Sequence, residues 1–293
     1  METRHGDRRR EMGAEDRSRH RPGFPQHKSL RLGVRETKQA VPAVGTAIRI
    51  LRHLSLVESA RAYQIADELA ISRSSCHGIL KALVEGGILG FSRRTKAYVL
   101  GTALIPLGAL AAERDWYIRL ARPYLREWVE TTQLTIFVAR LLPDREFIVV
   151  DAMNSSHIIK VTVSVGQTFP VTSPAMGGAQ VAFMPEADAQ RMIRSSGRRP
   201  PDRETVADND AFLAELPKIR KRGWAVSRTQ YYRNANAVAA PVLVDGQVTF
   251  VVCSLGSTQD LPAEGIDRFG VAIKKVADRI ADEIRNAIVH GVA

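Results

Sequence analysis

Apolar residues recur at a helical spacing in three stretches between residues 41 and 85. In the first stretch they are Ala47, Ile48, Ile50, Leu51, Leu54 and Val57, and in the second they are Tyr63, Ile65, Ala66 and Leu69. In the third they are Ile79, Leu80, Leu83 and Val84. Side chains three or four positions apart share one face of an α-helix, so this spacing predicts three short helices that bury those faces.

The third stretch carries clear signals for the start and the end of a helix. Ser72 precedes it and can accept a hydrogen bond from a first-turn amide, as N-cap residues do. Gly86 and Gly87 follow it and suit the left-handed backbone that ends many helices. A tight connection at Ala70 and Ile71 joins it to the second helix, which is typical of a helix-turn-helix.

Two short β-prone runs come next, at residues 88–91 and 98–100. They enclose the basic polar segment Ser-Arg-Arg-Thr-Lys of residues 92–96, so the pattern predicts a β-hairpin. Three helices followed by a hairpin form a winged helix-turn-helix, which we place at residues 39–101.

The remainder predicts a linker helix at residues 102–114 and an α+β domain at residues 115–293. Strand-like runs occur at 136–141, 147–153, 158–163, 237–244 and 248–254, with helical stretches at 175–184, 187–195, 212–222 and 264–289. The dipeptide Asp245-Gly246 predicts a hairpin between the last two strands. An antiparallel sheet with helices on its faces is the GAF-like fold of many small-molecule sensors.

Basic residues are concentrated toward the start of the chain, whose formal net charge is +11. Residues 1–40 carry 11 Lys and Arg against 6 Asp and Glu, residues 41–101 carry 8 against 4, and residues 102–293 carry 23 against 21. The gradient favours double-stranded DNA as the partner of the first part. Residues 1–38 have few large apolar residues, so we expect a disordered basic arm, which either adds phosphate affinity or reflects an overlong translation start.

Several kinds of chemistry have little support in the sequence. Cys76 and Cys253 fall in different predicted domains, and the seven His residues are scattered, so we expect no disulfide framework, no metal and no cofactor. No apolar run approaches the roughly 20 residues of a membrane span, so we expect no membrane contact and a cytoplasmic location. No nucleophile elbow, zinc-protease motif, P-loop or dinucleotide fingerprint is present, so an enzyme is disfavoured.

Polar residues of the third helix and the hairpin are the candidates for DNA contacts. On the helix they are Arg73, Ser74, Ser75, His77 and Lys81, which lie outside the apolar face and can reach base edges or phosphates. On the hairpin they are Arg93, Arg94 and Lys96, which we expect to contact phosphates. A solvated helix face and an ordinary solvated turn are the alternative interpretations.

The chain resembles the isocitrate lyase regulator (IclR) family of bacterial transcription factors from about residue 41 to residue 290. In the first part the similar segments are AVGTAIRIL at 43–51, IADEL at 65–69, SSCH at 74–77 and YVLG at 98–101. In the second part they are GQTFP at 166–170, AMG at 175–177, GWA at 223–225 and NAVAAPV at 236–242. The chain departs from the family pattern at Gly78, usually Arg, at Gly178, usually Lys, and at Gln230 and Asn234.

The resemblance implies an operator-binding regulator of a catabolic operon, which responds to a small organic effector. It also implies a homodimer that associates further into a dimer of dimers. The effector contacts that it implies are Ala175 and Met176 at the start of a helix, Ser227 and Asn236 along one wall, and Cys253 and Leu255 on the opposite strand. Cys253 and Leu255 stand where a carboxylate binder would have Ser, so an aromatic or otherwise partly apolar acid is favoured.

Three alternatives stay open at this point. Cys253 is also typical of a small buried hydrophobic residue with no ligand. A ligand-independent, nucleoid-like DNA-binding protein would share the basic N-terminal part, although it would not need a second domain of this size. A small-molecule-modifying enzyme is the weaker alternative.

Overall fold

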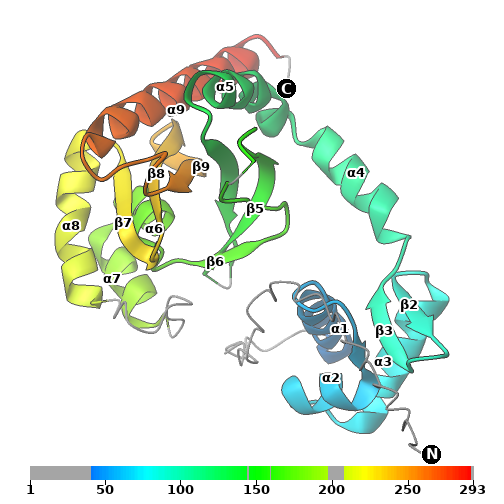
Figure 1. Ribbon diagram of the computed structural model, residues 1–293. Helices are drawn as coiled ribbons and strands as arrows, with labels where there is room; N and C mark the ends of the chain where they lie inside the picture. Colours follow the sequence, from blue (N-terminus) through cyan, green and yellow to red (C-terminus); the bar gives the residue numbers. More distant parts are fainter. Residues whose placement is uncertain (1–40, 144, 159, 197–207, 292–293) are drawn as a thin grey trace, which may run out of the picture. The chain divides into compact units, whose positions relative to one another are not determined.

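The computed structural model describes residues 41–291 except for 144, 159 and 197–207. The predicted basic arm of residues 1–38 therefore lies outside the described residues. Figure 1 traces the described helices and strands along the chain. None of the helices within these ranges is both long and apolar enough to cross a membrane.

Residues 42–100 form three helices and a three-stranded sheet. The helices are α1 (Pro42–Leu54), α2 (Ala62–Glu68) and α3 (Arg73–Glu85), and the strands are β1 (Ala60–Arg61), β2 (Leu89–Ser92) and β3 (Ala97–Leu100). The sheet is antiparallel with the order β1-β3-β2. Ser72 caps α3 by accepting a hydrogen bond from the Ser75 amide, and Gly87 adopts a left-handed φ of 69° just beyond the helix.

The apolar faces of these helices bury a small core, although three predicted core residues lie at the surface. Ile50, Ile65 and Leu80 are fully buried, together with Leu54, Cys76 and Leu89. Val57 is exposed because α1 already ends at Leu54, whereas Ile48 within α1 and Tyr63 within α2 lie on the exposed sides of their helices. A strand not expected from the sequence, β1, precedes α2. The two-residue length of β1 explains why no periodic pattern indicated it.

A second sheet of six strands forms the centre of the C-terminal part. Its order is β6-β5-β4-β9-β8-β7, and every neighbouring pair is antiparallel. The strands are β4 (Thr135–Leu141), β5 (Glu146–Met153), β6 (Thr168–Pro170), β7 (Ala225–Tyr232), β8 (Ala235–Val244) and β9 (Gln247–Ser257). The predicted α+β fold of this part is confirmed.

One prediction about the strands is wrong, and two strands of this sheet were not predicted. The described residues of 158–163 form no strand, and the edge strand is β6, which pairs with β5 at Phe147↔Phe169. Strand β7 was not expected from the sequence, because beyond Val226 it reads Ser-Arg-Thr-Gln and gives no apolar alternation. Its backbone pairing with β8 establishes it as a strand.

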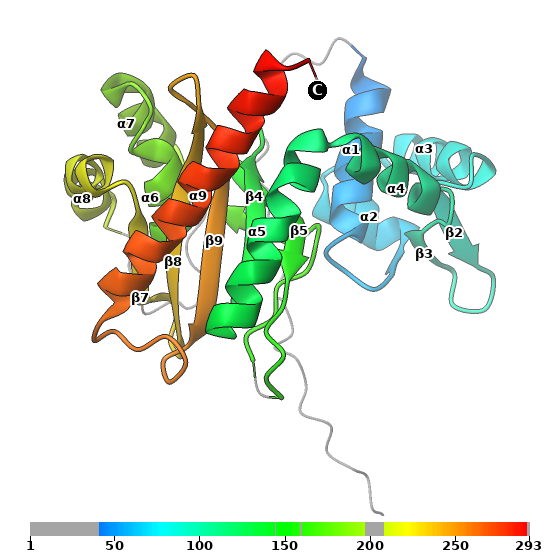
Figure 2. The same ribbon diagram turned by 90° about the horizontal axis from the view of Figure 1, so that it is seen from above.

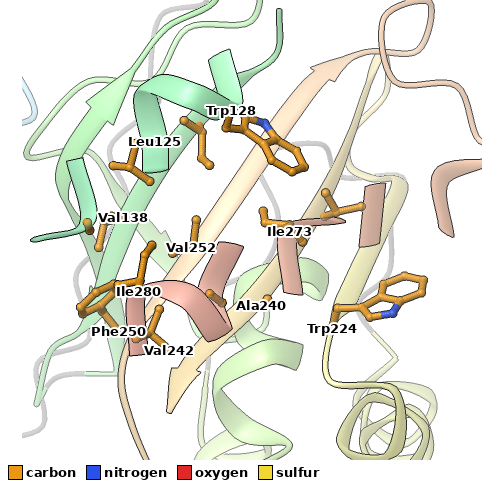
Figure 3. Close-up of a cluster of buried hydrophobic side chains, with 14 of the residues drawn as sticks. Leu125, Trp128, Val138, Trp224, Ala240, Val242, Phe250, Val252, Ile273 and Ile280 are labelled. Atoms are coloured by element: carbon orange, nitrogen blue, oxygen red, sulfur yellow. The ribbon is translucent and has the colours of Figure 1, made fainter. Parts of the chain in front are cut away.

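Helices cover both faces of this sheet. On one face lie α5 (Trp116–Thr132) and α9 (Ile266–Val289), which run side by side in Figure 2. On the other face lie α6 (Pro174–Val181), α7 (Glu186–Arg194) and α8 (Asn209–Arg222). Figure 3 shows Leu125 and Trp128 of α5 with Ile273 and Ile280 of α9 near apolar residues of the sheet such as Val252.

Helix α6 lies very close to the chain that precedes it. A Cβ atom at Gly177 would stand 1.8 Å from the carbonyl oxygen of Val171, and one at Gly178 would stand 2.8 Å from the Ile219 side chain. Only glycine fits at the first position without moving the backbone. The Gly-Gly pair therefore lets α6 lie close to Val171, to Ile219 of α8 and to Ala225 of β7.

Helix α4 (Leu104–Arg114) falls within residues 102–114, for which the sequence predicted a helix. None of its residues is buried, and Ile105, Leu107 and Leu110 are large apolar residues exposed to solvent. Asp115 directly follows it and caps α5 by accepting a hydrogen bond from the Ile118 amide at 3.3 Å. This helix therefore has an apolar surface with no cover among the described residues.

Candidate functional site

A narrow cavity lies between the first turn of α6 and the sheet, and we call it the α6 pocket. Its volume is about 40 Å³. Its lining residues are Phe137, Phe169, Ser173, Pro174, Ala175, Met176, Ser227, Tyr231, Tyr232, Ala235, Asn236, Ala237, Cys253 and Leu255. All six effector contacts expected from the sequence are among them, so the fold brings together residues that are far apart along the chain.

The strand register explains how these residues meet. Ser227 on β7 lies opposite Ala237 on β8, and Ala237 lies opposite Leu255 on β9. Cys253 lies opposite Phe137 on β4 and, two residues from Leu255, points to the same face. The lining thus forms a band across four strands beneath α6.

Aromatic rings form one side of the α6 pocket, and sequence reasoning missed them. Phe137 and Phe169 stack with 5.9 Å between ring centroids, and Tyr231 lies tilted at 5.7 Å from Phe169. Tyr231 also contacts Tyr232 edge to face at 4.8 Å. Phe169 belongs to the GQTFP segment, so the sequence offered a signal for it, whereas the two tyrosines belong to the strand that was not expected.

The polar groups of the lining are neutral donors and acceptors. The Ser227 side chain is buried, and its hydroxyl makes no hydrogen bond to another described residue. The Ser173 hydroxyl donates to the Pro170 carbonyl at 2.8 Å instead of capping α6, and Pro174 occupies the first turn of that helix. The first amides of α6, at Ala175 and Met176, therefore have no side-chain cap and carry the partial positive charge of a helix N-terminus.

The charge state of Cys253 follows from its burial. Desolvation raises the pKa of this thiol far above its ordinary value, so the thiol stays protonated at neutral pH. None of the lining residues is Lys, Arg, His, Asp or Glu. The pocket therefore offers an uncharged, largely apolar surface with one helix N-terminus and the hydroxyl groups of Ser173, Ser227, Tyr231 and Tyr232.

Asn236 differs from the other expected contacts because its amide is already engaged. Its Oδ1 accepts a hydrogen bond from the Thr229 amide at 2.9 Å, and its Nδ2 donates to the Leu261 carbonyl at 2.8 Å. The side chain is 1% exposed. Asn236 thus forms part of the pocket wall while its carboxamide binds backbone groups.

The eight candidate DNA contacts are all exposed. Arg73, Ser74, Ser75, His77 and Lys81 are on α3, where Lys81 pairs with Glu85 at 3.8 Å. Arg93, Arg94 and Lys96 are in the turn between β2 and β3, where Lys96 takes a left-handed φ of 56°. Arg61 on β1 braces this turn, since its Nε donates to the Thr95 carbonyl at 3.2 Å.

A glycine interrupts the exposed face of α3. A Cβ atom at Gly78 would meet nothing within 4 Å, so the position is open to a longer side chain. Elsewhere in the described ranges, no group of three or more His, Cys, Asp or Glu side chains is placed to hold a metal ion.

Comparisons with known proteins agree on one family. Residues 112–282 match the family model described as the C-terminal part of the bacterial transcriptional regulator IclR. An uncharacterised HTH-type transcriptional regulator of Escherichia coli strain K12, RhmR, is 25% identical over 225 residues, which cover 76% of this chain and 86% of RhmR.

Solved structures share the fold. An IclR transcriptional regulator from Alicyclobacillus acidocaldarius has a TM-score of 0.75 at 27% identity and covers 83% of this chain and 99% of its own. An IclR homologue from Microbacterium hydrocarbonoxydans in complex with 4-hydroxybenzoate has a TM-score of 0.67 at 18% identity and covers 83% of this chain and 99% of its own. Since the family model spans more than half of the sequence, the chain belongs to the IclR family of bacterial transcriptional regulators.

Proposed function

We propose that a small organic acid binds in the α6 pocket and thereby changes the affinity of residues 39–101 for operator DNA. The observation that carries this proposal is the composition of the pocket. The side chain of the buried Ser227, whose hydroxyl makes no hydrogen bond to another described residue, and the uncapped first turn of α6 meet in a lining that has no charged side chain. Helix N-termini and hydroxyls bind carboxylates, and the apolar remainder suits the body of an organic acid.

The acid that fits this lining best is aromatic. Its ring would pack against Phe137, Phe169 and Tyr231, while its carboxylate would accept hydrogen bonds from the α6 amides and from Ser227. Ala175, Met176, Cys253 and Leu255 complete the proposed contacts, and Asn236 belongs to the wall. The 4-hydroxybenzoate complex of the Microbacterium homologue supports this class of effector.

Binding requires the pocket to widen. The α6 pocket, with its volume of about 40 Å³, has room for only a few water molecules, so an aromatic acid must displace lining side chains. Such a ligand binds the widened state better than the narrow one, and this difference is what can shift a conformational equilibrium. A coupling free energy of about 1 to 3 kcal/mol between two sites is typical of allosteric proteins.

For the DNA-binding part, we propose a winged helix-turn-helix. Helix α3 would read the major groove through Arg73, Ser74, Ser75, His77 and Lys81, and the wing between β2 and β3 would contact phosphates through Arg93, Arg94 and Lys96. The formal excess of basic residues in 41–101 supports this assignment. In this proposal, residues 102–114 form the linker and residues 115–293 form the effector domain.

We also propose that the chain acts as a homodimer that pairs further into a dimer of dimers. The exposed apolar residues of α4, Ile105, Leu107 and Leu110, support the first step, because exposed apolar side chains favour association. Light scattering should give at least a dimer at micromolar concentration, and Leu107→Glu should shift it toward the monomer. A parent protein that is monomeric throughout this range would contradict the assembly.

The decisive experiment for the effector proposal joins DNA selection to ligand binding. The full chain is first used to select sequences from a random duplex library, and its affinity for the selected duplex is then measured with and without benzoate or 4-hydroxybenzoate. We expect one of these acids to change the DNA affinity by about 5-fold to 150-fold. Ser227→Ala should weaken the response while leaving DNA binding in the absence of acid unchanged.

Two results would contradict this function. Binding that is equally strong for all duplexes and indifferent to the acids would favour the nucleoid-like alternative. Chemical conversion of the added acid would instead favour an enzyme.

A further inference from the structure

The carboxamide of Asn236 lies on the other face of the sheet, although Asn236 is among the residues that line the α6 pocket. Side chains alternate along a strand, and Ala237 shares the α6 face with Ser227 and Leu255. Asn236 lies opposite Gly256 and therefore belongs to the face covered by α5 and α9. Its Nδ2 donates to the Leu261 carbonyl on that side at 2.8 Å.

One partner of the Asn236 amide is an irregular segment of β7. The pairing of β7 with β8 runs from Arg228↔Asn236 directly to Tyr232↔Ala235, so Thr229, Gln230 and Tyr231 form a bulge without ladder partners on β8. Thr229 has a φ of 55°, which is unfavourable for a β-branched residue. The Thr229 amide donates to Asn236 Oδ1, which replaces a ladder hydrogen bond that the bulge has lost.

The other partner is firmly anchored. Leu261 is fully buried, and it packs in the apolar cluster beneath α5 and α9. Its own amide donates to the Ser257 carbonyl at 2.9 Å, which closes the loop between β9 and α9. Asn236 thus connects the Thr229 amide of the bulge to a buried part of the core.

The ladder pair that ends the bulge, Tyr232 and Ala235, borders both the α6 pocket and a second cavity, which we call the outer cavity. The outer cavity has a volume of about 330 Å³ and is lined by Val161, Thr162, Val163, Gln167, Tyr232, Arg233, Asn234 and Ala235. Tyr232 and Ala235 line both cavities. Tyr231, at the end of the bulge, packs against Phe169 inside the α6 pocket.

We propose that Asn236 is a positioning residue that sets the size of the acid the α6 pocket accepts. The Asn236 side chain bonds to the Thr229 amide and to the Leu261 carbonyl, and it thereby links the bulge to the core. This link holds Tyr231 and Tyr232 in the positions that keep the α6 pocket narrow and separate from the outer cavity. Release of the bulge would let the two cavities join. This inference rests on the proposed function, since it concerns the same pocket.

The test compares one small and one large aromatic acid on the full chain. The affinities of benzoate and 2-naphthoate are measured by calorimetry for the parent and for Asn236→Ala. We expect the affinity ratio to shift by about tenfold in favour of 2-naphthoate, because the variant frees the bulge from one hydrogen bond and its anchor. Tyr231→Ala should shift the ratio in the same direction, and the double variant should add little to either single change.

Ser227→Ala is the matched control, because Ser227 faces the pocket but does not hold the bulge. It should weaken both acids by a similar factor and leave the ratio unchanged. If Asn236→Ala also weakens both acids equally, Asn236 contacts the ligand and the inference is wrong. If it lowers the melting temperature without moving the ratio, its role is only structural and the inference is again wrong.

A second measurement remains decisive if neither acid binds the parent or if Asn236→Ala does not fold. Asn236→Asp can still accept from the Thr229 amide, but its carboxylate repels the Leu261 carbonyl. Hydrogen exchange at residues 229–232 should then be about tenfold faster than in the parent, whereas exchange in α9 should be unchanged. Absence of acid binding would count against the proposed effector class alone, and unchanged exchange in the bulge would overturn the role of Asn236.

Discussion

Arg140 and Asp115 form a two-point ion pair at the start of α5. Arg140 Nη1 lies 2.6 Å from Asp115 Oδ2, and Nη2 lies 3.0 Å from Oδ1. The same carboxylate caps α5 through the Ile118 amide. Because Asp115 stands directly between α4 and α5, the pair ties the end of the linker helix to strand β4, which carries Arg140.

Loss of this ion pair should destabilise the C-terminal part. We expect Asp115→Ala to lower the free energy of unfolding by about 1 to 3 kcal/mol, since it removes a helix cap and leaves Arg140 unpaired in a half-buried place. Asp115→Asn should lower the free energy of unfolding by less, because the asparagine side chain can still cap α5. Urea titration followed by fluorescence measures both, and Asp282→Ala serves as the control, since its pair with Arg285 is exposed and lies within one helix. Equal losses for Asp115→Ala and Asp282→Ala would show that the Arg140 contact adds nothing.

The wing and α3 should differ in what they contribute to DNA binding. Replacing Arg93, Arg94 and Lys96 with Ala should weaken binding to all duplexes and lower the slope of log affinity against log salt by roughly 3, since phosphate contacts release counterions. Ser74→Ala or Ser75→Ala should instead change sequence preference. Anisotropy titrations at several salt concentrations separate the two effects. A triple variant that binds like the parent at every salt concentration would rule out the wing as a phosphate contact.

Replacement of Gly78 should stabilise α3 and tighten DNA binding. Gly78→Arg should stabilise α3 by up to about 1 kcal/mol and tighten DNA binding, because the site is open and a cation there would face the same way as the other exposed residues of α3. Gly78→Ala is the matched control and should raise the melting temperature without tightening DNA binding. The opposite outcome for Gly78→Arg, a loss of affinity, would indicate that DNA approaches the helix too closely here for a side chain.

The two cysteines should limit stability at alkaline pH. Burial raises the pKa of the Cys76 and Cys253 thiols above the ordinary value of 9.0, so the unfolded chain releases these protons before the folded one does. Their contribution is complete below pH 9 and is lost as the pH rises above it. We expect the free energy of unfolding to fall above about pH 9 by up to about 1.4 kcal/mol per pH unit for each thiol.

Denaturant titrations between pH 7 and 10 measure this dependence. The Cys76→Ala, Cys253→Ala double variant is the control, and its alkaline loss should be smaller. In the parent, iodoacetamide should label neither thiol at pH 8 until denaturant is added. Rapid labelling of Cys253 without denaturant would contradict its burial.

Most helices and the pocket positions could be predicted from the sequence, because they depend on local spacing and on segments with a family resemblance. Strand β7 could not, since its polar residues Ser227 and Arg228 owe their strand geometry to pairing with Ala237 and Asn236 of β8. The same reason hid Tyr231 and Tyr232 from the site prediction. The ion pair of Asp115 with Arg140 also could not be predicted, because it joins the start of a helix to a strand 25 residues later.

The amide of Asn236 illustrates a further limit. A pocket-lining asparagine suggests a ligand contact when only its place in a motif is known. Its actual partners, the Thr229 amide and the Leu261 carbonyl, lie 7 and 25 residues away and become visible only once the bulge and the β9–α9 loop are folded.

The exposed apolar residues of helix α4 have a consequence for how assembly of the regulator depends on its concentration. An isolated helix of 11 residues is marginal in water, and α4 has no buried residue to hold it. If its apolar side is covered only when chains associate, helix formation and assembly become one concentration-dependent step. A cell that doubles the copy number of this protein would then more than double the amount of assembled regulator, so that occupancy of an operator would rise steeply over a narrow range of expression.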